Sequence, residues 1–118
     1  MLLLMFLAQM AALDPEVATL RYNSAINAWS DCIDLRVERM AASPSQTISK
    51  SDLVYVAIDQ CHVMATDARR TFPAVVRNHL ADEGITSYSD SVVDLLADEM
   101  LKGLSETMLK KKVAQFAD

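Results

Sequence analysis

Glycine and proline are scarce in this sequence, which has 2 Gly and 3 Pro. Most β-sandwiches and barrels need such turn residues every ~8–12 positions, and collagen and flexible linkers need many more, so the scarcity excludes these classes. The chain also lacks an excess of positive charge, because its formal net charge at pH 7 is -5. Nucleic-acid-binding domains show clustered Lys and Arg, so we expect no nucleic-acid partner.

Apolar residues are abundant and make up 52% of the 118 residues, against 23% charged residues. This balance excludes intrinsic disorder, and the length corresponds to one domain. No alternation of apolar and polar residues is long enough to indicate a β-strand, whereas helical spacing recurs along the chain. The composition and pattern therefore predict an all-α protein, with residues 14–118 forming a single helical domain.

Residues 1–13 are apolar except for Gln9. A membrane-spanning helix needs ~20 apolar residues, and Asp14, Pro15 and Glu16 end this run too early. The run has the length of the apolar part of a signal peptide, but no Lys or Arg precedes it and no A-x-A-like cleavage site is present. Three interpretations stay open: a cleaved signal peptide, a short helix packed on the domain, or an anchor at a membrane surface.

Three long amphipathic helices are predicted in the domain, with apolar residues three and four positions apart. Asp14 and Pro15 are typical of a helix start, and residues 43–45 (Ser-Pro-Ser) end the first helix. The second helix begins near Ser49 or Ser51 and continues past Pro73, where an internal proline predicts a kink or a restart. We expect a small bundle in which the first two helices form an antiparallel hairpin.

Two glycines and a serine-rich cluster place the remaining helix boundaries. Gly84 is predicted to cap the end of the second helix in the left-handed conformation, followed by a hydrophobic contact of Ile85. The third helix is predicted to begin within residues 87–90 and to carry the lysines 110–112 in its closing turns, where positive charges favour the negative end of the helix dipole. Gly103 lies inside this helix and should cost ~1 kcal/mol relative to Ala, unless another backbone approaches it closely.

The two cysteines, Cys32 and Cys61, are predicted to meet across the hairpin. Cys32 lies 14 residues before Gln46 and Cys61 lies 15 residues after it. At ~1.5 Å of rise per residue both fall at nearly the same height, and both lie on the apolar sides of their helices. Trp29, one turn before Cys32, is expected to cover the bridge. The alternative is a pair of buried free thiols, but a disulfide would indicate an oxidising compartment.

A metal site built from the cysteines and histidines is excluded by their spacing. His62 follows Cys61 directly, so their side chains point ~100° apart on a helix. His79 lies ~25 Å further along the same helix, whereas a zinc site needs all its ligands within ~2.4 Å of the ion. We therefore expect neither a metal ion nor another cofactor.

The acidic residues of the third helix are the remaining candidates for catalysis. Paired carboxylates can act as acid and base when burial separates their pKa values. Here they lie off the apolar side, which favours a solvated face; they are Asp90, Asp94, Asp98 and Glu99. Two isolated glycines also cannot form a phosphate-binding loop. The sequence therefore predicts no enzyme activity.

Some apolar residues lie away from the main apolar side of their helix. They are Val56 and Val63 on the second helix, and Leu95, Leu109, Val113 and Phe116 on the third. Helices that are apolar on two sides usually have two partners. The second partner is residues 1–13, the remaining helix of the bundle, or another molecule, so these residues are predicted as an interface for a homodimer or a protein partner.

Several short patterns occur together in the first two helices and the connection between them. They are Trp29-x-x-Cys32, the Ser-Pro-Ser connection at residues 43–45, and Ala57-x-x-x-Cys61 leading into Arg69-Arg70, all after a short apolar leader. In this respect the chain resembles a group of small exported bacterial helical proteins with one cysteine pair. The resemblance implies a secreted or periplasmic helical domain and carries no catalytic residues.

Together these features predict a non-enzymatic periplasmic or envelope protein that acts by binding a partner or itself through a helical face. Two alternatives belong to other functional classes. One is a thiol-redox protein that uses Cys32 and Cys61 reversibly, which would need an exposed and reactive thiol. The other is a helical scaffold tethered to a membrane by residues 1–13. A membrane-associated or cytoplasmic location is the alternative to export.

Overall fold

The computed structural model describes residues 14–117, and the regular structure in this range is entirely α-helical. The helices are α2 (Pro15–Ala41), α3 (Lys50–Gln60), α4 (His62–Arg69), α5 (Phe72–Asp82) and α6 (Asp90–Gln115). The all-α prediction is confirmed. The interpretations of residues 1–13 fall on a segment outside the described range. Between residues 14 and 117, none of the helices combines the length and the apolar character that crossing a bilayer requires.

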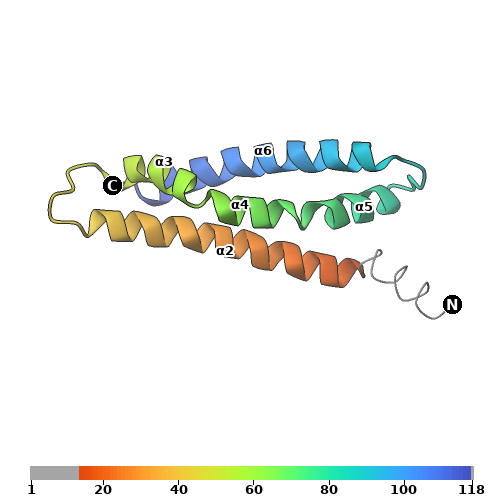
Figure 1. The fold of residues 1–118 in the computed structure, drawn as a ribbon, viewed down its shortest axis with the longest axis horizontal. Coiled ribbons are helices and arrows are strands. Elements are labelled where there is room, and N and C mark those ends of the chain that lie inside the picture. Colours follow the sequence, from red (N-terminus) through yellow and green to blue (C-terminus); the bar gives the residue numbers. More distant parts are fainter. Residues whose placement is uncertain (1–13, 118) are drawn as a thin grey trace.

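All five helices of the described range run roughly along one long axis of the molecule (Figure 1). Segments α3, α4 and α5 follow one another along α2, and all three pack against it. Helix α6 lies along the same three segments and contacts α2 over a shorter stretch. The middle segments therefore hold the two long helices together.

The helix starts follow the side chains that the sequence analysis identified. The Asp14 carboxylate accepts a hydrogen bond from the Glu16 backbone N–H at 2.8 Å. The Ser49 hydroxyl accepts one from the backbone N–H of residue 52 at 3.3 Å, and Ser89 caps α6 in the same way. Each cap satisfies a backbone donor that the first turn of a helix leaves free, so the predicted starts are confirmed.

The second predicted helix is divided at two places. The restart at Pro73 is confirmed, because α5 begins at Phe72 with the proline in its first turn, where a missing N–H costs no hydrogen bond. A break at Cys61, between α3 and α4, was not predicted. The Cys61 N–H still binds the Ala57 carbonyl at 2.9 Å, and its own carbonyl accepts from Met64 at 3.0 Å. The break is therefore a local change of backbone angles and leaves the hydrogen bonding largely continuous.

A single core cluster runs through the described part of the chain. Its large members include Trp29 on α2, Leu53 on α3 and Phe72 on α5, each at most 1% exposed. Alanines occupy the core positions between them, and their small size lets the helices approach closely; these are Ala57, Ala65, Ala68 and Ala97. Burial of this apolar surface is the main favourable contribution to folding.

The two glycines occupy different backbone environments. Gly84 has a φ of +77°, and the Ile85 N–H binds the Leu80 carbonyl at 2.8 Å while the Gly84 N–H binds Ala81 at 3.0 Å. This pair of bonds is the Schellman ending of a helix, so the predicted cap is confirmed. Ile85 itself remains 45% exposed. At Gly103 an added Cβ would meet no atom within 4 Å, so no close backbone approach requires the glycine.

Alanine substitutions at the two glycines are expected to change stability in opposite directions. Gly84→Ala should lower the free energy of unfolding by about 1–2 kcal/mol, because a side chain is strained in the left-handed conformation. Gly103→Ala should raise it by about 1 kcal/mol, since alanine has the higher helix propensity. Urea unfolding followed by circular dichroism measures both. A shift in the same direction for both variants would contradict this assignment of their backbone roles.

Candidate functional site

Cys32 and Cys61 form a disulfide, as predicted from their positions. The bond joins α2 to the break between α3 and α4, and the two Cα atoms are 6.0 Å apart. This distance lies within the range usual for disulfides. The bridge closes a separation of 29 residues and so ties α2 to the segment of α3 and α4 by a covalent bond.

The disulfide lies at the edge of the core, and one of its two cysteines is fully buried. Cys61 is 1% exposed, and Cys32 is half-buried against the same cluster. Trp29, predicted to cover the bridge, is also 1% exposed and belongs to that cluster. Thiol–disulfide exchange requires a thiolate to reach a sulfur atom, so the burial of Cys61 obstructs attack on its sulfur.

We expect glutathione to reduce the bridge slowly in the folded protein. Because Cys61 is shielded, reduction in buffer should be on the order of tenfold slower, or more, than in urea. Alkylation of free thiols at successive times, followed by mass measurement, gives both rates. Equal rates in the two conditions would show instead that the bridge is accessible in the folded state.

An ion pair between a buried lysine of α6 and a half-buried aspartate of α2 connects these two helices. The Lys112 ammonium is 2.8 Å from the Asp34 carboxylate, and the Lys112 residue is 2% exposed. Lys112 also donates a hydrogen bond to the Gln115 side chain at 3.2 Å, and the Gln115 amide donates to Asp34 at 3.2 Å. From the sequence, Lys112 is predicted only as one of three lysines in the closing turns of the third helix. Its inward position depends on the approach of α2, which no local pattern indicates.

The predicted interface residues fall into two groups. Val56, Val63 and Leu95 are exposed, at 44%, 66% and 61%. In contrast, three residues in the last turns of α6 and at its C-cap are half-buried against the core, as expected if their second partner is another helix of the bundle; they are Leu109, Val113 and Phe116. The physical reason is that α3 packs against α6, so this side of α6 also faces the protein. The exposed candidates for an interface are therefore the first three.

The acidic residues of α6 form ion pairs with the middle segments. Asp98 lies 2.9 Å from the guanidinium of Arg69, which also approaches Asp94 at 3.8 Å. Asp90 binds Arg77 at 2.6 Å, and this hydrogen bond raises the pKa of the arginine above its usual value. These contacts connect α4 and α5 to α6. Within residues 14–117 no three side chains of the metal-binding types gather at one place.

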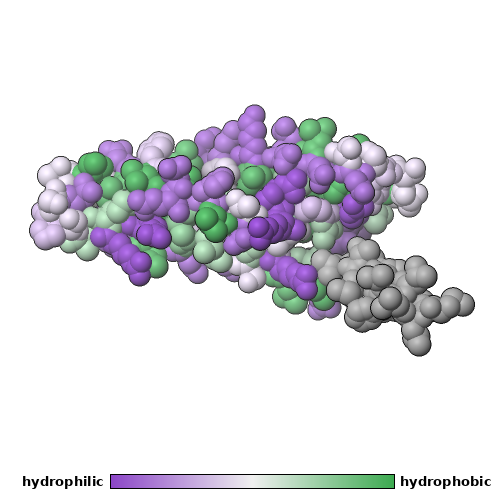
Figure 2. All heavy atoms as spheres, viewed as in Figure 1, coloured by the Kyte–Doolittle hydropathy of each residue, from purple (hydrophilic) through white to green (hydrophobic). Residues whose placement is uncertain are grey.

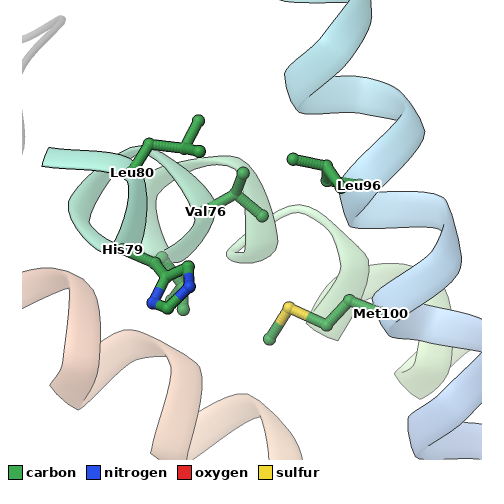
Figure 3. Close-up of a pocket in the computed structure, with 6 residues that line it drawn as sticks. Val76, His79, Leu80, Leu96 and Met100 are labelled. Carbon is green, nitrogen blue, oxygen red and sulfur yellow. The ribbon is translucent and has the colours of Figure 1, made fainter. Parts of the chain in front are cut away.

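An apolar pocket of about 260 Å³ lies between α5 and α6 (Figure 3). On the α5 side, Val76 and Leu80 are each only 8% exposed and His79 is exposed. On the α6 side, Leu96 and Met100 complete the wall (Figure 3). The sequence predicted no site at His79. It could not place a pocket there, because a pocket depends on the distance between two helices.

The face of the molecule in Figure 2 carries no large apolar patch in the part of the chain that the structure describes. Figure 2 shows apolar side chains as small groups separated by hydrophilic ones on the face it displays. Large contiguous apolar patches are typical of extensive protein interfaces, and this face has none among the described residues. The pocket between α5 and α6 is therefore a candidate site for an apolar ligand.

Comparisons of the chain with protein-family models, with curated proteins and with solved structures find no match. The resemblance to small exported two-cysteine helical proteins therefore stays a prediction.

Proposed function

We propose that this chain is a non-enzymatic helical binding protein that works in an exported, oxidising compartment, either the periplasm or outside the cell. The observation that carries the proposal is the disulfide between Cys32 and Cys61. Disulfides persist in oxidising compartments and are rare in the cytosol of most organisms. The apolar run of residues 1–13 supports the same location as a signal peptide.

The proposed architecture is a bundle of three arms: α2, the broken arm of α3 to α5, and α6. In it α2 and α3 form an antiparallel hairpin that the disulfide holds closed. The packing of α2 along α3, α4 and α5 supports this arrangement, as does the position of the bridge. A cross-linked frame keeps exposed side chains in fixed positions, which suits recognition because less freedom is lost on binding.

The polar contacts favour binding over catalysis and redox exchange. The charged groups that cluster, Arg69 with Asp98 and Lys112 with Asp34, connect helices to one another. Burial of Cys61 supports a structural bridge, whereas a redox protein presents an accessible thiol. The exposed Val56 and Leu95 supply apolar surface for a protein partner or a second copy.

The experiment that tests this function is the intact mass of the protein isolated from its own host, with free thiols alkylated at lysis. We expect no alkylation, and a gain in mass after reduction that corresponds to hydrogen on two sulfurs. Fractionation should place the protein outside the cytoplasm, and loss of N-terminal residues would identify the signal peptide. Alkylated cysteines in the freshly isolated protein would contradict an oxidising location. A variant with both cysteines changed to serine is the control for the mass change.

Self-association is tested separately by sedimentation over a range of protein concentrations. If the exposed apolar residues pair two copies, the sedimentation coefficient should rise with concentration, and Leu95→Glu should abolish the rise because a buried unpaired charge is costly. If the sedimentation coefficient does not change with concentration, the protein does not pair with itself, and the partner of the exposed residues is a different protein.

A further inference from the structure

We propose that the pocket between α5 and α6 binds the hydrocarbon tail of a medium-chain amphiphile, with the oxygen of its head group at His79. The proposal gives a ligand class to the binding role stated above and rests on that role. It does not depend on export or on the state of the cysteines, which the mass measurement tests independently.

The walls and size of the pocket favour a hydrocarbon occupant. Five of the six lining side chains are aliphatic or thioether: Val75, Val76, Leu80, Leu96 and Met100. An apolar cavity of about 150 Å³ is large enough for benzene, so by volume the 260 Å³ found here accommodates about ten carbon atoms. Met100 has a flexible side chain whose sulfur reaches toward the opening between the helices (Figure 3), which lets this wall adapt to the shape of a tail.

The dimensions of the pocket favour a small molecule over a docked helix or a second copy. Its lining covers residues 75–80 of α5 and 96–100 of α6, and each stretch is only about 6–8 Å long at 1.5 Å per residue. A helix of three turns needs a groove about 16 Å long. A stable protein interface buries about 800 Å² on each partner, far more than this opening provides.

His79 determines where a polar atom can lie. Of the described residues that line the pocket, it alone carries a nitrogen or oxygen in its side chain. Figure 3 shows its ring extending from the edge of α5 opposite to Leu80, on the side where Met100 lies across the pocket, and the residue is exposed. A neutral imidazole has one donor and one acceptor nitrogen, so it can bind a hydroxyl or a carboxylate at the pocket mouth. One polar group at the edge of an apolar pocket fits a molecule with one polar end.

The test is a titration of the full chain with 1-octanol and with octanoate, monitored by the NMR signal of the Met100 methyl group. We expect a saturable shift with both probes. Leu96→Trp should fill the pocket and weaken binding by about tenfold or more, because the tail loses its space. Leu35→Trp is the matched control: it makes the same change on α2, at a residue that is 50% exposed and outside the lining, and should bind as the unchanged protein does.

A second pair of variants tests the head-group contact. His79→Phe keeps a ring at the pocket mouth and removes its hydrogen bonds, so both probes should bind about threefold to tenfold more weakly. His79→Gln retains a donor and an acceptor and should restore part of this loss. Circular dichroism of each variant checks that it is folded.

Three results would overturn the proposal. The first is the absence of a saturable Met100 shift with either probe. The second is equal binding by Leu96→Trp and the unchanged protein. The third is a Met100 signal that moves with protein concentration alone, since the occupant would then be a second copy. None of these results alters the mass test of the disulfide, so failure of the pocket and failure of the exported role are distinguishable.

Discussion

Replacement of both Cys32 and Cys61 by alanine is expected to lower the free energy of unfolding by about 3–4 kcal/mol. The disulfide closes a separation of 29 residues, and in the chain-entropy account a cross-link of this span removes that much conformational freedom from the unfolded chain. Small domains have a total stability of about 5–15 kcal/mol, so the loss is a large share of it. Urea unfolding followed by the fluorescence of Trp29, the single tryptophan, measures the change.

Chemical reduction of the unchanged protein provides the control for this substitution. It removes the bond and leaves both side chains in place, so its effect should agree with that of the double variant to within about 1 kcal/mol, the small cost of truncating a buried Cys61 side chain. A loss below about 1 kcal/mol in both experiments would contradict the role of the bridge as a stabilising cross-link.

The features that the sequence predicted correctly depend on short-range chemistry. Asp14 and Ser49 bind backbone N–H groups within three residues of themselves, and Gly84 adopts a backbone conformation that other residues avoid. Pro73 restarts a helix because it lacks a backbone donor. Each of these effects is decided by neighbours along the chain, so the residue types suffice to locate the helix boundaries.

The disulfide is the long-range feature that could be predicted. Its two cysteines lie at nearly equal distances from the connection between their helices, and helices rise by a constant amount per residue. The break at Cys61 could not be predicted in the same way, because no glycine or proline marks it. The break occurs at the residue that is bonded to α2.

The features of the candidate site that the sequence left open are those in which a third helix decides the burial of a residue. Leu109 and Val113 lie on a second side of α6 by periodicity, but the packing of α3 against α6 makes them half-buried. Lys112 belongs to a run of three lysines, and only the position of Asp34 on α2 explains why this one is buried. The pocket at His79 likewise depends on the spacing of α5 and α6. Such features follow from the relative placement of helices, which one sequence does not specify.

The two partners of the buried ion pair are expected to respond unequally to substitution. The Lys112 side chain is 3% exposed, whereas the Asp34 side chain is 35% exposed. Asp34→Ala leaves the ammonium buried with only Gln115 beside it, so we expect a loss of about 2–4 kcal/mol in the free energy of unfolding. Lys112→Met leaves a carboxylate that water reaches, and the new side chain fills the same space, so the expected loss is about 1 kcal/mol or less.

The double variant Asp34→Ala/Lys112→Met gives the sharpest measurement of this asymmetry. Because the methionine removes the buried charge that makes Asp34→Ala costly, the double variant should be more stable than Asp34→Ala alone, by about 1–3 kcal/mol. Urea unfolding of the four proteins provides the thermodynamic cycle. Lys110→Met is the matched control at an exposed lysine and should change stability by no more than about 0.5 kcal/mol. A double variant less stable than both single variants would show that the pair stabilises α2 against α6 by some means other than neutralising a buried charge.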